Sequence, residues 1–294
     1  MSNETNKVIN VEAYLRQLPR LNVKMGGDIF YRGQSNISYK LTPSVLRDNM
    51  QYKEHEIYTE IMTECAHEFD NCKLHNEILS KMQHYGVPTR LLDVTTNALV
   101  ALYFACDAAK DKDEDGVVYV IKTEKSKIKQ YDSDAISILA SLPRFDNNEK
   151  KEILDLAQKV LKEQGSEDNK IKKFNKEKII KRLLHEIKKE KPAFENIINA
   201  EDILNNYFLL PRKINARIIR QSGAFIIFGL GENEIKINEE FSISNLDNSK
   251  SYKIIIKAET KQTIINQLSC FGISKATLHP ELYKVAEFIK ERYL

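Results

Sequence analysis

Short strand-like segments come from distant parts of this sequence, and helical patterns of varying length separate them. Residues 28–32, 116–122 and 224–229 are rich in Val, Ile, Phe and Tyr, which are enriched in β-strands. Residues 234–237 and 252–256 continue the series. Regular alternation of strands and helices would predict consecutive parallel units. The irregular spacing instead predicts an α+β fold with one mixed central sheet and surrounding helices.

One predicted helix constrains the packing of that sheet. Residues 97–109 are apolar on nearly every face, so this helix should lie in the core rather than on the surface. Asp93, Thr95 or Thr96 precedes it and could cap its N-terminus. A second predicted helix, at 53–72, has a single apolar stripe with three-four spacing and should bury one face only.

Composition changes in the second half of the chain. Lysine and glutamate dominate residues 147–191, aromatic residues become rare, and helical periodicity persists. We therefore predict a single domain over 1–294 that carries a helical insertion at 147–206. The insertion could contact a neutralising antitoxin or a chaperone, or it could be a helical pair whose charged faces only aid solubility.

The overall charge excludes little by itself. The formal net charge is +3, which gives no global electrostatic case for nucleic acid but allows a local basic face.

The four cysteines form no C-x-x-C pair and no Cys/His cluster with zinc-ligand spacing, so no metal is expected. P-loop, G-x-G-x-x-G, G-x-S-x-G and H-E-x-x-H motifs are also absent from the sequence.

Nothing in the sequence predicts a membrane protein. The first seven residues are polar and no apolar signal segment follows them. The most apolar window, 98–109, is far shorter than the roughly 20 residues that a membrane-spanning helix needs. We expect a cytoplasmic protein with no membrane contact.

The tetrapeptide Tyr31-Arg32-Gly33-Gln34 is the first group of residues that could recognise a ligand. Arg32 ends a predicted strand, and its planar guanidinium suits phosphate or carboxylate. Gly33 lets the backbone bend or approach a ligand closely. A structural ion pair that fixes the loop is the alternative interpretation of Arg32.

The decapeptide 84–93, HYGVPTRLLD, is denser in polar groups. Gly86 and Pro88 fix the backbone between polar side chains that could recognise a ligand, namely His84, Tyr85, Thr89, Arg90 and Asp93. The N-terminus of the following helix, near Thr95, could bind an anion because its amide groups lack internal partners. Two alternatives remain open: Arg90 could pair with Asp93, and His84 could be a core histidine.

A basic segment at 211–220 precedes the third strand-like segment. Helical spacing would place Lys213, Arg217 and Arg220 on one face, which could meet the phosphates of a nucleic acid or could simply be solvated. Gln221 follows at the head of the predicted strand, where its amide can both donate to and accept from a sugar hydroxyl.

These three segments resemble the FRG family. The aromatic-Arg-Gly motif of that family reads Tyr31-Arg32-Gly33 here, the middle block reads HYGVPTRLLD at 84–93, and the late block spans 215–228. The resemblance covers roughly 29–229. Proteins of this family are bacterial and viral, so the resemblance implies a toxin-like or antiviral defence setting.

The layout is also similar to a remote version of the ADP-ribosyltransferases. In those enzymes a first-strand Arg or His holds NAD, a polar middle strand lines the cleft, and a late strand begins with the catalytic acid. The resemblance implies that Arg32, Asp93 and Gln221 act in catalysis, with NAD as substrate and no metal. The residues that it implies for NAD binding are Tyr31, Gly33, Gln34, His84, Tyr85, Thr89, Arg90 and Thr95.

One position departs from that pattern. A glutamate would stabilise the positive charge that develops as the nicotinamide bond breaks, whereas Gln221 supplies no negative charge. Asp93 could serve instead. The sequence therefore leaves three functions open: an ADP-ribosyltransferase that modifies nucleic acid or protein, a non-catalytic nucleotide-sensing module that reports to a partner, and a nuclease-like effector. The nuclease-like effector is the least favoured of the three, because the sequence shows no paired carboxylates with a nearby lysine.

Overall fold

A seven-stranded mixed sheet forms the centre of the computed structural model, which describes residues 8–22, 28–107, 111, 113–237 and 251–293. The strands are β1 (Asp28–Gln34), β2 (Leu91–Thr95), β3 (Gly116–Thr123), β4 (Ile128–Gln130), β5 (Tyr207–Leu210), β6 (Gly223–Ile227) and β7 (Tyr252–Ile256). Their order in the sheet is β4-β5-β6-β2-β1-β3-β7. Among these seven strands, β4 and β5 pair in parallel and the other neighbours pair antiparallel. The predicted α+β fold with a mixed sheet is confirmed.

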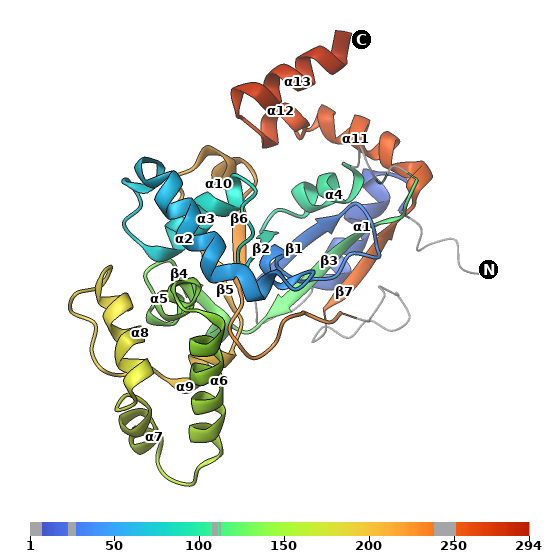
Figure 1. Ribbon diagram of the computed structural model, residues 1–294. Coiled ribbons are helices and arrows are strands. Elements are labelled where there is room, and N and C mark those ends of the chain that lie inside the picture. The colour runs from blue at the N-terminus through green and yellow to red at the C-terminus, as the bar shows by residue number, and fades with distance from the viewer. Residues whose placement is uncertain (1–7, 23–27, 108–110, 112, 238–250, 294) are drawn as a thin grey trace.

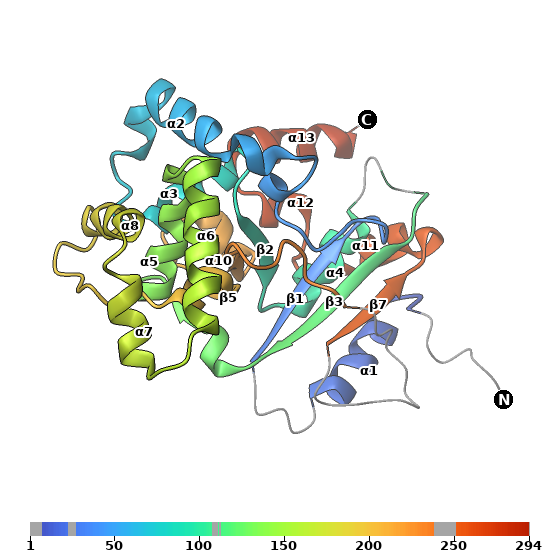
Figure 2. The ribbon, with the colours of Figure 1, turned by 60° about the horizontal axis from the view of Figure 1, so that its bottom comes forward.

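Helices cover the sheet unequally. Near β1, β3 and β7 lie α1 (Val11–Asn22), α4 (Ala98–Cys106) and α11 (Lys261–Cys270). Beyond the β4 end lie α5 (Asp134–Ser141), α6 (Asn147–Lys162), α7 (Glu167–Phe174), α8 (Lys178–Lys188) and α9 (Ala200–Leu204). Figure 2 shows this helical group beside the β5 edge, well away from β7. The remaining helices are α2 (Glu54–Glu64), α3 (His75–His84), α10 (Ala216–Arg220), α12 (Lys275–Leu278) and α13 (Leu282–Tyr293).

Helix α4 lies in the core, as its apolar sequence predicts. Ala101, Leu102 and Ala105 are fully buried. Its N-terminus is capped by Asn97, whose Oδ1 accepts from the backbone N–H of Leu99 at 3.0 Å. The predicted cap at Asp93, Thr95 or Thr96 is therefore wrong, because β2 extends to Thr95 and only Asn97 stands where the chain turns into the helix.

Two other predicted elements differ from the structure. The helix expected at 53–72 ends at Glu64, and a short 3₁₀ turn at Ala66–Phe69 follows Cys65. The strand expected at 234–237 is a single bridge, Leu41 with Ile235. A lone bridge satisfies fewer backbone groups than a ladder, so this segment runs along the surface of the sheet without joining it.

The hydrophobic core is continuous on one face of the sheet and divided on the other. Phe30, Leu92 and Ile226 belong to one cluster that runs across β1, β2 and β6. On the opposite face, Leu91 packs with α3 and the helical group, whereas Tyr31 packs with α4, α1 and α11. These two clusters do not merge, and the boundary between them falls along β2.

The helical region at 147–206 shares a core with the sheet. Ile153 of α6, Ile180 of α8 and Ile203 of α9 are fully buried in the same cluster as Leu209 of β5 and Ile227 of β6. Charged residues occupy the outer faces of these helices, as their composition predicts. The region is thus packed into the domain through a large apolar surface rather than attached to it by a linker.

Candidate functional site

Strands β1 and β2 are neighbours that barely pair. All seven residues of β1 pair with β3, and all five residues of β2 pair with β6. Between β1 and β2 the ladder is one pair, Tyr31 with Thr95. The sheet therefore has a seam at its middle, and backbone groups that face the seam need other partners.

Arg32 bridges this seam. Its Nη1 donates to the backbone carbonyl of Asp93, and in the amide orientation that satisfies both of its groups, the Gln34 side chain accepts from Arg32 Nε at 3.2 Å. Burial lowers the pKa of Arg32, the neighbouring cation Arg47 lowers it further, and Asp93 and Tyr119 oppose both. An arginine nevertheless keeps its charge at neutral pH, so a partly exposed guanidinium stands between the two strands.

A second arginine, which the sequence analysis did not single out, lies beside the first. Arg47 donates through Nε and Nη2 to the carbonyl of Thr42, at 2.8 and 2.6 Å, so its guanidinium is held in place. It also lines a cavity of about 440 Å³ together with Tyr39, Lys40 and Glu234. Two neighbouring guanidinium groups at a strand end favour an anion with more than one negative charge.

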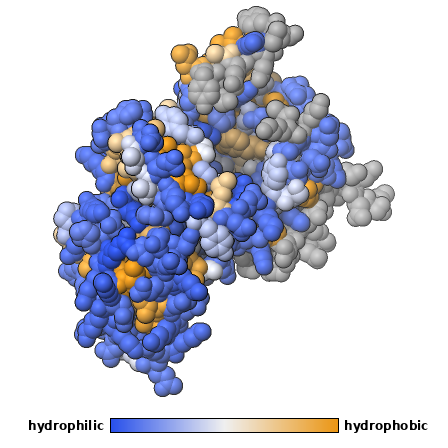
Figure 3. Space-filling view, in the orientation of Figure 1, coloured by the Kyte–Doolittle hydropathy of each residue, from blue (hydrophilic) through white to orange (hydrophobic). Residues whose placement is uncertain are grey.

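Asp93 is exposed although it lies in a central strand. Its neighbours on β2 are buried, and its carboxylate accepts from Gln83 Nε2 at 3.0 Å. A residue in the middle of a sheet is exposed only where no helix covers that face. Asp93 thus marks an uncovered strip of the sheet between α3 and α4, at the boundary where the apolar core of this face is divided. We call this strip the groove. Figure 3 shows the surface hollowed between the parts of the molecule that α10 and α4 form.

Gln221 lies beside the other end of β2. The Thr95 hydroxyl donates to the Gln221 carbonyl at 2.7 Å, and the turn into β6 passes through Ser222 at φ 46°, in the left-handed region. The Gln221 side chain points toward the C-terminal segment, where Nε2 donates to the carbonyl of Leu278 at 3.0 Å. Among the described contacts, no side-chain hydrogen bond joins Gln221 to Arg32 or to the Asp93 carboxylate.

The three predicted catalytic residues are therefore linked through one strand. Strand β2 accepts from Arg32 through its Asp93 carbonyl and donates to the Gln221 carbonyl through Thr95. Residues 27–114, which include β1, α3, β2 and α4, match the model of the FRG domain family. The chain contains an FRG domain. No curated protein and no solved structure matches the chain.

The FRG domain match covers two of the three motifs. Arg32 and the block at 84–93 lie inside the matched residues, whereas Gln221 lies beyond them. The two matched motifs meet at the seam, because β1 carries the first and β2 carries the end of the second. Gln221 is placed beside β2 by the order of strands and by its hydrogen bond with Thr95, not by the family match.

Several residues assigned to NAD binding have structural roles in the FRG domain. Gly33 packs against α4, and a Cβ there would lie 1.8 Å from the carbonyl oxygen of Ala101. The glycine is thus required by helix–strand packing, which leaves no room for a ligand on that side. Tyr31, Gln34 and Thr89 are buried, and Thr89 Oγ1 donates to the Gln83 side chain at 2.7 Å. Their assignment to NAD stays a prediction that their burial does not favour.

Arg90 has a partner that sequence reasoning missed. It is 1% exposed, its Nε donates to the Glu54 carboxylate at 2.9 Å, and its Nη1 donates to the Phe228 carbonyl at 2.8 Å. Lys150 of α6 lies 2.7 Å from the same carboxylate. Burial alone would raise the pKa of Glu54, but Arg90 and Lys150 outweigh it and lower that pKa. Arg90 thus pairs with Glu54 rather than with Asp93 and joins β2 to the helical region.

His84 and Tyr85 lie at the C-terminal end of α3 and line a cavity between α3 and α10. The His84 ring is 3.3 Å from the Glu281 carboxylate. Burial lowers the pKa of His84, Arg217 lowers it further, and Glu281 opposes them. Tyr85 is 68% exposed, and its ring meets the His84 ring edge-on at 4.9 Å. Tyr85 is therefore accessible, whereas the His84 side chain is only 15% exposed. Their assignment to NAD stays a prediction.

The structure places two of the three predicted basic-face residues, Arg217 and Arg220, on one helix, and the third, Lys213, outside it. Helix α10 begins at Ala216, with Asn215 as its N-cap, so Lys213 lies in the preceding turn and not on the helix. Arg217 and Arg220 are three residues apart on α10 and share its surface. The expectation that helical spacing aligns all three cations is wrong for Lys213, because the Asn215 cap starts the helix two residues later.

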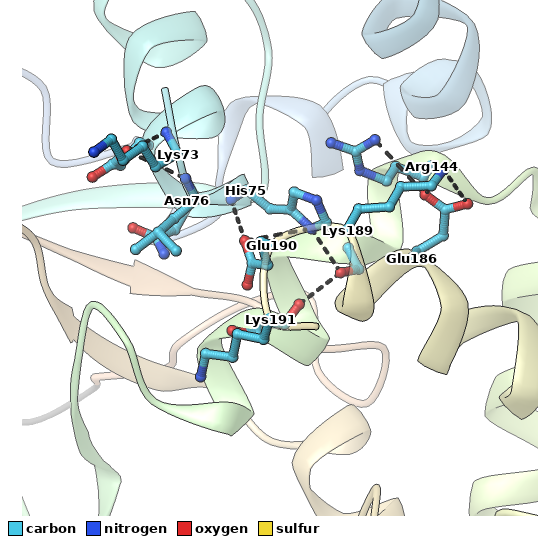
Figure 4. Close-up of polar contacts among 12 residues, drawn as sticks. Lys73, His75, Asn76, Arg144, Glu186, Lys189, Glu190 and Lys191 are labelled. Carbon is cyan, nitrogen blue, oxygen red and sulfur yellow. Dashed lines mark hydrogen bonds and ion pairs between the residues drawn. The ribbon is translucent and has the colours of Figure 1, made fainter. Parts of the chain in front are cut away.

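A buried His/Glu/Ser cluster lies outside the groove. His75 Nδ1 is 2.9 Å from Ser141 Oγ, and the Glu190 carboxylate accepts the His75 backbone N–H. Figure 4 shows these groups between α3, α5 and α8. Ser141 is fully buried, so a substrate cannot reach its hydroxyl, and the cluster holds three helices together. Burial, with help from Arg144 and Lys189, lowers the pKa of His75 to about 3, which makes the ring neutral despite the nearby Glu190.

Neither a metal-binding group of side chains nor a membrane-spanning helix is found in the part of the chain that the structure describes. No group of three or more His, Cys, Asp or Glu side chains among the described residues is arranged to hold a metal ion. Within the same part of the chain, every helix is too short or too polar to cross a membrane.

Proposed function

We propose that this FRG-domain protein is an NAD-dependent ADP-ribosyltransferase that acts as a toxin-like or antiviral effector. The observation that carries the proposal is the adjacency of β1, β2 and β6 at the centre of the sheet, with Arg32 and Gln221 both bonded to β2. This is the order of segments that the resemblance to ADP-ribosyltransferases implies. The defence setting rests on the family resemblance alone.

Arg32 and Arg47 are suited to hold the pyrophosphate of NAD. Arg47 is close enough to lower the pKa of Arg32, and Arg47 lines a cavity with Tyr39 and Glu234. A pyrophosphate would satisfy the guanidinium donors that the protein leaves available and would relieve the repulsion between the two cations. Binding would also fix the nicotinamide end of NAD relative to the seam.

The exposed Asp93 carboxylate is suited to the bond-breaking step. The bond between ribose C1′ and the nicotinamide nitrogen breaks, and neutral nicotinamide leaves with the electron pair. The positive charge that develops on the ribose is stabilised by a nearby carboxylate. An acceptor nucleophile then bonds to C1′ and loses its proton to Asp93. Gln221 can supply hydrogen bonds to a ribose hydroxyl once its amide leaves the Leu278 carbonyl.

Label transfer from NAD tests the proposal. Purified protein, incubated with NAD labelled in its adenylate part and with RNA, DNA or lysate proteins, should transfer the label. Arg32→Ala and Asp93→Asn should each lower the rate by about 10²-fold or more, because each removes a charge that acts on the transition state. Arg16→Ala is the matched control, since Arg16 is exposed and pairs only with Glu12.

Thermal melts must show that the variants are folded. Arg32→Ala also leaves the Asp93 carbonyl without its partner, so Arg32→Lys, which retains a cation, separates a loss of charge from a loss of this bond. No transfer to any acceptor by the wild-type protein would contradict the proposal.

A non-catalytic nucleotide sensor is the second candidate. It is favoured by Gln221, which is neutral and whose amide already donates to Leu278. A sensor would bind NAD or a related nucleotide saturably in calorimetry, would lose that binding in Arg32→Ala, and would release no nicotinamide. Release of nicotinamide by the wild-type protein decides against it.

A further inference from the structure

The surface beside the groove combines an exposed aromatic ring with cations. We define the basic-aromatic surface by Tyr85, Lys213, Arg217 and Arg220. Tyr85 lines a cavity of about 340 Å³ between α3 and α10 together with Ile214 and Ile218. This volume is at the lower end of the range of ~300–1,000 Å³ for pockets that hold small ligands. Lys213, Arg217 and Arg220 do not line this cavity but lie close to its lining residues in the chain. Figure 1 shows α10 and α3 next to each other.

The three cations of this surface are not paired with acidic side chains of the described residues. Two neighbouring cations are engaged, since Arg212 pairs with Glu77 at 3.0 Å and Lys81 pairs with Glu68 at 3.0 Å. Lys213, Arg217 and Arg220 take part in none of the ion pairs among the described residues. Glu281 lies 3.3 Å from the His84 ring. The surface is therefore positive where it meets the groove.

Tyr85 presents its ring as a platform. The residue is 68% exposed, and the edge-on contact with His84 fixes the ring. Exposed Ile214 lines the same cavity and extends the apolar area. An aromatic ring flanked by cations is the arrangement by which proteins stack an unpaired base and contact its phosphates.

The basic-aromatic surface is continuous with the groove. Arg217 is close enough to His84 to lower its pKa, and its carbonyl accepts the backbone N–H of Gln221 at 2.9 Å. On the other side, Gln83 adjoins His84 in α3 and donates to the Asp93 carboxylate. A strand that stacks on Tyr85 would therefore place a neighbouring nucleotide near Asp93.

We infer that single-stranded nucleic acid binds across the basic-aromatic surface. A single strand fits better than a duplex because stacking on Tyr85 needs an unstacked base. Phosphates fit Lys213, Arg217 and Arg220. The further statement that this strand is the acceptor of ADP-ribose rests on the proposed function, whereas binding itself does not.

Fluorescence anisotropy tests this inference. Labelled single-stranded RNA and DNA oligonucleotides of mixed sequence, the matching duplex, and an acidic polyglutamate peptide are titrated with the full-length protein over a series of salt concentrations. We expect single strands to bind more tightly than the duplex and the peptide. Tyr85→Ala should weaken single-strand binding by about 5- to 150-fold, the range for loss of one stacked base.

The arginines give an independent readout. The double variant Arg217→Gln/Arg220→Gln should reduce the slope of log affinity against log salt by about 0.7 for each charge removed. Tyr52→Ala, at a tyrosine that is 56% exposed in another part of the surface, is the control for Tyr85. Lys159→Gln/Lys162→Gln, with the same three-residue spacing on exposed positions of α6, is the control for the arginines.

The outcomes separate this inference from the proposed function. Wild-type affinity in Tyr85→Ala, an unchanged salt slope in the arginine variant, or equal binding of duplex or polyglutamate would overturn it. Tight single-strand binding without label transfer from NAD leaves the inference standing and counts against the enzyme. Label transfer to protein alone, without single-strand binding, supports the enzyme and overturns the inference that single strands bind here.

Discussion

Individual residues in this domain show how burial decides between a binding role and a structural role. Arg32 and Arg90 have the same side chain and come from the two motifs. Arg90 is enclosed and paired with Glu54, whereas Arg32 is partly exposed at the seam and has Arg47 as a neighbour. Loss of either partner of a buried ion pair destabilises the fold because it leaves an unpaired buried charge, whereas a partly exposed guanidinium beside another cation attracts anions.

His75 makes stability depend on pH near neutrality. Its pKa is about 3 in the folded protein and about 6.5 in the unfolded chain. Between these values the unfolded chain binds the proton and the folded protein does not, so the free energy of unfolding falls as pH falls below 6.5. Between pH 6.5 and 5, where carboxylates titrate little, His75 contributes a slope of up to about 1.4 kcal/mol per pH unit.

Urea denaturation at a series of pH values measures this slope. His75→Asn keeps a donor near the position of Nδ1 and removes the titration, so its slope should be shallower than that of the wild type. His67→Asn, at an exposed histidine, should keep the wild-type slope. Equal slopes in wild type and His75→Asn would mean that the His75 ring is charged in the folded protein.

At the level of elements, most of the sheet was predictable from local sequence. Residues 116–122 and 252–256 carry enough β-branched and aromatic residues to be recognised, and both form strands. Strands β4 and β5 were missed because Ile128–Gln130 is short and polar and Tyr207–Leu210 adjoins charged helices. Their strand character comes from pairing with each other and with β6, which a local pattern cannot show.

The candidate site was predictable only in part, for a similar reason. Sequence motifs indicated Arg32 and Asp93, which meet at the seam. Arg47 carries no local signal, since it gains its place only when its loop folds over the end of β1. The local sequence does not indicate Glu54 as the partner of Arg90 either, because 36 residues separate the two in the chain and tertiary packing alone brings them together.

The contact between β1 and α4 gives a prediction for Gly33. Gly33→Ala would place a methyl group 1.8 Å from the Ala101 carbonyl, so the strand and the buried helix must move apart. We expect a loss of about 2 kcal/mol or more in the free energy of unfolding, measured by urea denaturation. Gly223→Ala at the start of β6, where a Cβ would lie 3.4 Å or more from its neighbours, should change stability little. Comparable stability of both variants would show that α4 is not tightly packed there.

At the level of the whole molecule, the helical region is part of the core. Because residues of α6, α8 and α9 share a cluster with β5 and β6, removal of 147–206 would expose those strands and break the Lys150–Glu54 pair. We expect this deletion variant to aggregate or to lack a cooperative melting transition in calorimetry. A soluble deletion variant with a sharp transition would mean that the sheet folds without these helices. A search for an antitoxin or chaperone is better made with charge substitutions on the outer faces.

The seam between β1 and β2 also has a mechanical consequence. One residue pair and one guanidinium connect the two halves of the sheet across this line, whereas full ladders hold each half together. The spacing between the halves is therefore set mainly by side chains, because one apolar cluster runs across β1, β2 and β6 and the Phe30 ring stacks on Phe208 of β5. A small change in that spacing would break few hydrogen bonds, so its cost would come from the packing of these apolar side chains.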